Sequence, residues 1–253
     1  MTLKNMFSAM AIAMFISACS TPRTSDEALM KWYPNQKYHQ SLETSALEQE
    51  ALEGSIEAEL QFGIRLMNGD RVDQDIEKGA KIFKRLAMLG DARAQFMLGT
   101  AYDQGAGVER NPDQALGLFR DSAEQGYDLG QYWYAFMLSR GRGIPEPDWK
   151  AALPWFQKAA DQGHPLAQFS LGEIHESCRA GLDRNFDLAA YWYRRSFSEN
   201  PSAAAQYNIL RLIDLGLVAW QDGDPGEPQS RIKILDMSKF EPCDPDAYDP
   251  LLN

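Results

Sequence analysis

The sequence predicts an all-α protein, a right-handed α/α solenoid of about four to five helix-turn-helix repeats. Two observations carry this prediction. One apolar pattern recurs every 36 or 37 residues, and the residues that begin or end helices recur at the same spacing. The copies run over 55–90, 94–126, 127–163 and, more loosely, 164–200, and a partial fifth begins near Ala204. In such a chain each unit buries its apolar face by stacking on its neighbours.

Two repeat positions mark the start and the end of a helix of about four turns. The first holds residues whose side-chain oxygen can cap free N–H groups: Asp75, Asn111, Asp148 and Asn185. The second holds residues that tolerate the left-handed conformation that ends a helix: Gly90, Gly126, Gly163 and Asn200. Pro112 follows its cap at the first helical position, and Pro201 blocks continuation after Asn200.

The core of each unit is predicted from large and small residues that alternate at fixed repeat positions. The large ones are Phe83, Phe119, Phe156 and Tyr193, and the small ones on the same helix are Gly79, Ala115, Ala152 and Ala189. On the preceding helix, a close-approach position holds Gly63, Gly99, Ala135 and Gly172. Each unit is therefore interpreted as helix A, a Gly-rich turn and helix B, the first helix carrying Ala94, Leu98 and Tyr102 on its packed side.

These residues resemble a known family. The pattern of Ala94, Leu98-Gly99, Tyr102, Gly105-x-Gly107-Val108, Ala115, Phe119 and Gln125-Gly126 is similar to the Sel-one-like repeat, a relative of the tetratricopeptide repeat. The resemblance covers about 55–215 and implies protein–protein scaffolding, with no catalytic residues to transfer. Repeat four departs from the pattern, because His175 stands at the Tyr position and Cys178-Arg179-Ala180-Gly181 replaces the Gly-x-Gly turn.

The first eighteen residues are predicted to be a lipoprotein signal peptide. Lys4 precedes a short apolar stretch, and Ile16-Ser17-Ala18-Cys19 resembles a bacterial lipobox, so we expect cleavage before Cys19 and a diacylglyceryl thioether on it. Ser20, where Asp would signal retention, favours the periplasmic face of the outer membrane. The alternative is an ordinary secretory peptide with an incidental cysteine.

The rest of the predicted organisation follows from composition. Residues 19–40 are expected to form a tether, 41–54 a capping helix with Leu42, Ala46, Leu47 and Leu52 on one side, 55–220 the solenoid, and 221–253 a Pro/Asp-rich tail. With Cys19 assigned to lipid, Cys178 and Cys243 are predicted to form a disulfide that pins the tail; two unpaired thiols are the alternative. The net charge of −11 and the lack of a basic run argue against nucleic acid and against membrane contact other than through the lipid.

No catalytic or metal constellation is found. His175 and Cys178 have a metal-ligand spacing, but the Tyr position favours a packed histidine. Ser230-Arg231-Ile232-Lys233 matches Ser-x-x-Lys without its companion motifs, which argues against a cell-wall or β-lactam hydrolase. We therefore expect no enzyme, no cofactor and no metal.

A partner surface is predicted opposite the packed side of helix A, where residues vary from repeat to repeat. The residues assigned to it are Met97, Thr100, Trp133, Phe136, Arg140 and Glu173. Trp133, Phe136 and Arg140 are the residue types that dominate interface energetics. The alternative is that the aromatic residues fill an inter-repeat core. The predicted function is an outer-membrane-anchored periplasmic scaffold in an envelope or secretion assembly, with a glycan- or peptidoglycan-binding lipoprotein as the second possibility.

Overall fold

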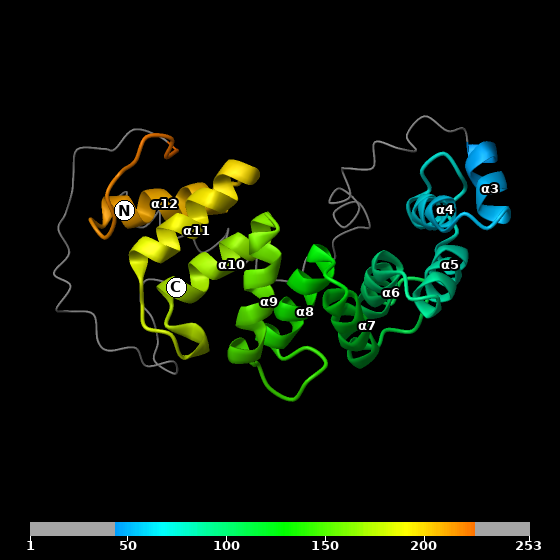
Figure 1. The fold of residues 1–253 in the computed structure, drawn as a ribbon, viewed down its shortest axis with the longest axis horizontal. Coiled ribbons are helices and arrows are strands. Elements are labelled where there is room, and N and C mark those ends of the chain that lie inside the picture. Colours follow the sequence, from blue (N-terminus) through cyan, green and yellow to red (C-terminus); the bar gives the residue numbers. More distant parts are fainter. Residues whose placement is uncertain (1–43, 226–253) are drawn as a thin grey trace, which may run out of the picture. The chain divides into compact units, whose positions relative to one another are not determined.

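The structure is a computed structural model that describes residues 44–225, and over this range its regular elements are all helices (Figure 1). The chain divides into two compact units, one up to Ile82 and one from Phe83, with the division inside helix α5. The predicted all-α fold is confirmed. Cys19, the signal peptide, the tether, Leu42, Ser230 and Cys243 lie outside the described residues, so the predictions for them stay predictions.

The first unit holds α3 (Thr44–Leu52), α4 (Ile56–Asn68) and the start of α5 (Ile76–Met88). Helix α3 lies inside the predicted capping segment 41–54 and packs on α4 through Leu47, which is fully buried with Ala58 and Phe62. Leu52 was expected on the same apolar side, but it is 78% exposed. This detail of the prediction is wrong because α3 ends at Leu52, beyond its contact with α4.

The second unit is a stack in which each helix from α6 onward contacts the next. Its elements are α6 (Ala92–Gln104), α7 (Pro112–Glu124), α8 (Asp128–Arg140), α9 (Trp149–Asp161), α10 (Pro165–Glu176), the 3₁₀ turn η1 (Arg179–Gly181), α11 (Phe186–Glu199) and α12 (Ala203–Asp214). Helices α6, α8 and α10 are the A helices of repeats two to four, and α7, α9 and α11 are their B helices. Helix α6 also contacts α8, which is helix A of the next repeat.

The predicted helix starts are confirmed at all four B helices. Asp75, Asn111, Asp148 and Asn185 each accept a hydrogen bond from the backbone N–H three residues later, at 2.9, 3.1, 2.8 and 2.9 Å. Each therefore satisfies one of the donors that a helix N-terminus leaves unpaired.

The helix ends agree with the prediction in three repeats out of four. Gly90, Gly126 and Gly163 have φ of 89°, 88° and 91°, and the residue after each donates back five residues, as Asp91 does to Leu86, in the Schellman arrangement. Asn200 was expected to do the same, but its φ is −147° and its N–H donates to Ser196. The left-handed assignment is wrong here, because Pro201 favours extended backbone at the residue before it.

The turn between helices A and B keeps positive φ at two positions even where its glycines are replaced. In repeats two and three, positive φ occurs at Gly105 and Gly107 and at Gly141 and Gly143. In repeat four the same positions hold Cys178 and Ala180, with φ of 57° and 60°. The predicted departure of repeat four is confirmed: two positive-φ positions are kept with other residue types, and the 3₁₀ turn η1 with a further positive φ of 73° at Gly181 is added.

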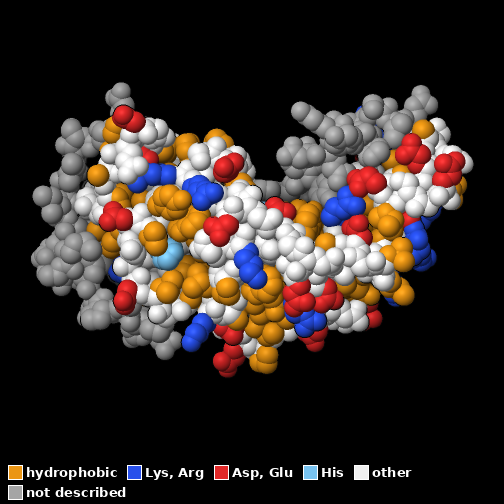
Figure 2. All heavy atoms as spheres, in the orientation of Figure 1, with side chains coloured by type: hydrophobic (Ala, Val, Ile, Leu, Met, Phe, Trp, Pro, Cys, Tyr) orange, Lys and Arg blue, Asp and Glu red, His pale blue; other side chains and the backbone are white. Residues whose placement is uncertain are grey.

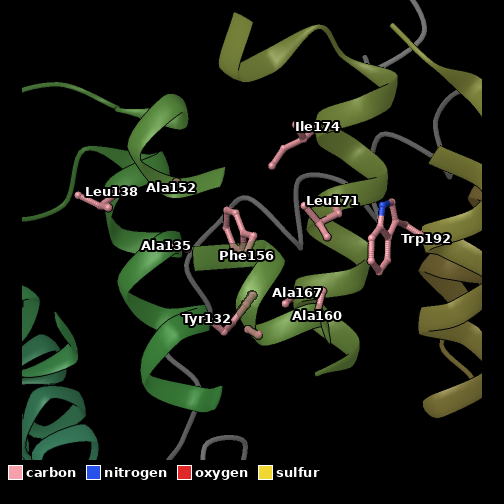
Figure 3. Close-up of a cluster of buried hydrophobic side chains, with 11 residues drawn as sticks. Tyr132, Ala135, Leu138, Ala152, Phe156, Ala160, Ala167, Leu171, Ile174 and Trp192 are labelled. Carbon is pink, nitrogen blue, oxygen red and sulfur yellow. The ribbon is translucent and has the colours of Figure 1, made fainter. Parts of the chain in front are cut away.

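The core contains the large residues at their predicted positions. Phe83, Phe119, Phe156 and Tyr193 are each at most 1% exposed, and Phe156 lies between α8 and α10 (Figure 3). The close-approach position is explained by the same rings: a Cβ on Gly99 would lie 2.9 Å from Phe119, and one on Gly172 would lie 2.4 Å from Tyr193. The prediction of large side chains opposite small ones is confirmed.

The chain after α12 folds back onto α11. Asp224, whose side chain is 1% exposed, forms an ion pair with Arg194 at 2.6 Å, and Arg194 also donates to the carbonyl of Ala219. Val218 joins the apolar cluster around Phe186 and Tyr193. The end of the solenoid and the first residues of the predicted tail, as far as residue 225, therefore cover α11.

Candidate functional site

Three predicted contact residues form one group on α8. The rings of Trp133 and Phe136 lie 5.4 Å apart between centroids, and the guanidinium of Arg140 lies 5.6 Å from the Phe136 ring. Arg140 is exposed, and the two aromatic side chains are partly buried. We call Trp133, Phe136 and Arg140, with Glu173 of the neighbouring helix A, the α8 contact surface. Figure 2 shows hydrophobic side chains among acidic and basic ones at the level of α8 and α9.

Glu173 on α10 joins this group electrostatically. Burial raises the pKa of Glu173, while the positive charges of Arg179 and Arg140 act in the opposite direction. Glu173 and Arg140 also act on the buried Tyr132, whose pKa is raised mainly by burial. The surface thus combines two aromatic rings with one exposed cation and one partly buried carboxyl group that lies within range of that cation.

The two predicted residues on α6 differ from those on α8. Met97 is 6% exposed, so its assignment to the contact surface is wrong: the side chain is part of the packed core. Thr100 is partly buried, and its hydroxyl donates to the carbonyl of Phe96 at 3.0 Å. Repeat two therefore offers little free surface beside α8.

Trp133 belongs to the core as well as to the surface. Its ring stacks on the buried Phe119 of repeat two, with centroids 6.0 Å apart, and contacts Tyr132 at 5.9 Å. Removing this ring would leave a cavity between repeats and cost about 3–5 kcal/mol. Trp133 therefore packs between repeats, as the alternative expected, and its role in binding stays a prediction. The exposed Arg140 is better suited than Trp133 to a test of binding.

The structure contains polar contacts between repeats that the sequence analysis did not predict. Asp103 of α6 pairs with Arg142 of the turn after α8. Glu176 of α10 pairs with Arg211 of α12 and accepts from the hydroxyl of Tyr193 at 3.0 Å. Asp103 and Glu176 occupy one repeat position, but Ser139 stands between them in repeat three, so spacing alone gave no regular acidic signal.

A glutamine pair ties the start of helix A to the end of helix B. Gln125 donates to Gln95 at 2.6 Å in repeat two, and Gln162 donates to Gln131 at 2.8 Å in repeat three. In repeat four Gln168 is present, but Glu199 stands where the donor would be, and the buried Oε1 of Gln168 has no hydrogen-bond partner in the described structure. The recurrence of Gln at these spacings was the available signal.

The described residues show no arrangement for metal chemistry. Residues 44–225 contain no group of three or more His, Cys, Asp or Glu able to hold a metal ion. Cys178 is 3% exposed and disulfide-bonded, so its sulfur is not free to bind metal, and its partner lies outside the described residues. His175 is partly buried, and burial lowers its pKa. No helix in 44–225 has the length and apolar character needed to span a bilayer.

Fold and surface together define an α-helical repeat protein whose A helices carry the candidate contact residues. The chain belongs to the Sel1 repeat family: the Sel1 repeat matches 56–91, 92–127, 128–164 and 165–201. Sel1 repeats mediate protein–protein interaction or scaffolding, and they are typically non-catalytic adaptor folds.

Solved structures share this fold. A protective antigen of uropathogenic Escherichia coli that displays an SLR fold is similar with a TM-score of 0.62 and 31% identity, over 67% of this chain and 36% of that one. A Sel1 repeat protein from Oxalobacter formigenes also has a TM-score of 0.62, with 28% identity over 68% of this chain and 49% of that one.

Among curated relatives, chitin synthase regulatory factor 3 of Schizosaccharomyces pombe is 29% identical over 124 residues, which is 48% of this chain and 13% of the relative. Chitin synthase regulator SKT5 of Saccharomyces cerevisiae is 27% identical over 150 residues, 57% of this chain and 21% of the relative. The chain thus spans about a fifth or less of the length of these relatives.

Proposed function

We propose that this protein is an outer-membrane-anchored periplasmic scaffold that binds a protein partner through the A helices of its repeats. The observation that carries the proposal is the α8 contact surface, where Trp133 and Phe136 lie beside an exposed arginine. Tryptophan and arginine are the residue types that contribute most to binding energy at interfaces. Support also comes from the names of the two yeast relatives, which describe regulators of an enzyme.

The proposed location rests on the lipobox-like Ile16-Ser17-Ala18-Cys19, with lipid on Cys19, and on Ser20 for the outer membrane. Under this proposal the periplasm supplies the oxidising environment in which Cys178 pairs with Cys243. Cys178 is disulfide-bonded, which fits that compartment.

Glycan or peptidoglycan binding is the second possibility, and the aromatic geometry disfavours it. A sugar ring needs a free aromatic face, but Trp133 stacks on Phe119, and the ammonium group of Lys158 lies 3.9 Å above the ring of Trp155. The α8 contact surface fits a protein side chain better, because the exposed cation of Arg140 lies beside the rings. Hydrolysis of cell-wall or β-lactam substrates has no support among the described residues.

The test is crosslinking in intact cells followed by mass spectrometry of the captured material, with the lipidated full chain. Arg140→Glu should abolish capture of the partner. The melting temperature should fall only slightly, because Arg140 is exposed and the new carboxylate acts mainly by repelling Glu173. Lys150→Glu, an exposed cation on helix B of the same repeat, is the matched control and should capture normally. Equal capture by wild type and Arg140→Glu would contradict the proposal, as would recovery of muropeptides without a protein.

A further inference from the structure

The end of α5 carries an apolar pair that the repeat does not require. Met88 and Leu89, at the turn between α5 and α6, are 80% and 63% exposed. The same two positions hold exposed or half-exposed polar residues in the later repeats: Glu124 and Gln125, Asp161 and Gln162, Ser198 and Glu199. Packing of the solenoid therefore does not explain large hydrophobic side chains at this point of repeat one.

The backbone N–H groups of this turn are hydrogen-bonded, so the two side chains project from an ordered base. Leu89 donates to Arg85 at 3.2 Å, Gly90 to Ala87 at 3.0 Å, and Asp91 to Leu86 at 3.2 Å. No atom lies within 4 Å of where a Cβ on Gly90 would be, so the turn faces open space. The exposure of the apolar pair is thus a property of an ordered turn.

The same helix is the most basic of the four B helices. Helix α5 has Lys78, Lys81, Lys84 and Arg85 against Glu77, a net charge of +3, and Lys78 contacts Glu48 at 3.9 Å. Helix α7 has one basic and three acidic residues, a net charge of −2, in a chain whose net charge is −11. Lys84 and Arg85 are exposed one turn before Met88 and Leu89. We call Lys84, Arg85, Met88 and Leu89 the α5 tip.

We propose that the α5 tip inserts Met88 and Leu89 into the interface of an anionic phospholipid bilayer, with Lys84 and Arg85 at the headgroups. Large apolar side chains next to basic ones are the combination that binds such interfaces. Two side chains are too few for a protein interface, which buries about 800 Å² per partner and needs a complementary surface. A fluid bilayer needs no such complementarity. Charge patterning along the sequence did not reveal this group, because the chain has no basic run. The basic and apolar residues are neighbours only on the helix surface.

The inference rests on the proposed anchoring of Cys19, which brings the chain to a membrane. The lipid would hold the protein at the bilayer, and the α5 tip would set which side of the second unit faces it. The insertion thus contributes orientation, because a diacylglyceryl anchor already provides the attachment.

The experiment uses the full-length lipidated protein in vesicles of phosphatidylethanolamine and phosphatidylglycerol. An environment-sensitive maleimide dye is attached, without reductant, to Met88→Cys or Leu89→Cys. The matched controls are Glu124→Cys and Gln125→Cys, at the same positions of repeat two. We expect a blue shift and quenching by brominated lipid tails for dyes at 88 and 89 only. Replacing phosphatidylglycerol by phosphatidylcholine should weaken both signals, and Met88→Glu should remove them from a dye at 89.

Equal responses at 88 and 124 would overturn the insertion, whether or not the protein carries lipid. A blue shift at 88 without quenching by brominated tails would indicate a protein contact and would also overturn it. Mass spectrometry of Cys19 before reconstitution tests the anchor separately, since a chain without lipid contradicts the anchor and not the insertion.

Discussion

Repeats three and four have the same pair of helices, but they satisfy the fold with different side chains. Gly141 and Gly143 provide the left-handed residues of the turn in repeat three, with φ of 65° and 76°, whereas repeat four holds Cys178 and Ala180 there, with φ of 57° and 60°. A left-handed conformation costs a residue with a Cβ about 1–2 kcal/mol. The comparison teaches that stacking of neighbouring helices imposes the backbone of the turn even where the local sequence disfavours it.

Repeats three and four also use different side chains for their polar contacts. Within repeat three the two helices are joined by a neutral hydrogen bond, with Gln162 donating to Gln131, and the ion pair of Arg142 reaches repeat two. Repeat four lacks that donor and instead buries Glu176 between Tyr193 and Arg211. Repeat four is thus the unit in which ionisation and residue replacements should affect stability most, and the following predictions test this difference.

The largest effect is expected from Glu176→Ala. The side chains of Glu176 and Arg211 are 1% and 15% exposed, and removing the carboxylate leaves a nearly buried cation without its partner. The free energy of unfolding should fall by about 3–5 kcal/mol, as measured by chemical denaturation. Ser139→Ala, at the same position of repeat three, is the control and should cost about 1 kcal/mol or less. Similar losses for both variants would contradict the distinction between the repeats.

Acid should destabilise repeat four through His164. Burial lowers the pKa of His164 to about 4, against the opposing charge of Asp128, and its Nδ1 accepts from Ala167 N–H at 3.3 Å. Between pH 6.5 and about 4 the unfolded chain binds a proton that the folded chain excludes. Stability should therefore fall as the pH falls through this window, by up to about 3 kcal/mol. His164→Asn, which keeps a capping side chain without titrating, should lack this part of the pH dependence in thermal unfolding.

Gly172→Ala should test whether helices A and B approach each other more closely in repeat four than in repeat three. Ala135 is native at this position in repeat three, but a Cβ on Gly172 would lie 2.4 Å from the Tyr193 ring, which Glu176 holds by its hydroxyl. Overpacking should cost about 1–3 kcal/mol in chemical denaturation. Gly172→Ala combined with Tyr193→Phe should lose less, because the freed ring can move. Equal losses in the two backgrounds would mean that the hydroxyl does not fix the ring.

Ala180→Gly should stabilise the protein by about 1 kcal/mol, because it relieves a positive φ of 60°. The reverse change in repeat three, Gly143→Ala, should destabilise it, since the φ is 76° and the new Cβ would lie 2.8 Å from the carbonyl oxygen of Pro112. Melting temperatures of the two variants should thus move in opposite directions. A lower melting temperature for Ala180→Gly would show that the turn of repeat four is not strained.

The smallest effect is expected from Glu199→Gln, which places an amide donor at the repeat position of Gln125 and Gln162, whose counterpart acceptor in repeat four is the unpartnered Oε1 of Gln168. One neutral hydrogen bond should add about 0.5–1.5 kcal/mol. Gln162→Glu, the reverse change in repeat three, should remove the bonds of Gln162 to Gln131 and to the Gly126 carbonyl. Chemical denaturation of both variants measures the difference, and an unchanged stability for Glu199→Gln would indicate that residue 199 does not reach Gln168.

Most of the contact surface and most helix ends could be predicted from the sequence, but Met97 and Asn200 could not. Trp133, Phe136 and Arg140 follow from helical spacing alone and are found together on α8. The prediction for Met97, at the repeat position of Trp133, is wrong. Its burial depends on what packs against α6, which residue spacing does not reveal. The left-handed conformation predicted for Asn200 is wrong, because the following proline outweighs the tendency of asparagine toward left-handed backbone.

The sequence by itself determined the repeat, its phase, the four capping residues and the large and small core positions, because these depend on residues a few positions apart on one helix. Tertiary structure alone decided which polar groups meet across repeats, as Glu176 meets Arg211 and Asp103 meets Arg142. Tertiary structure also decided that Cys178 and Ala180 keep a left-handed turn. The physical reason is that these outcomes depend on the positions of neighbouring repeats, and stacking fixes those positions only when the whole solenoid folds.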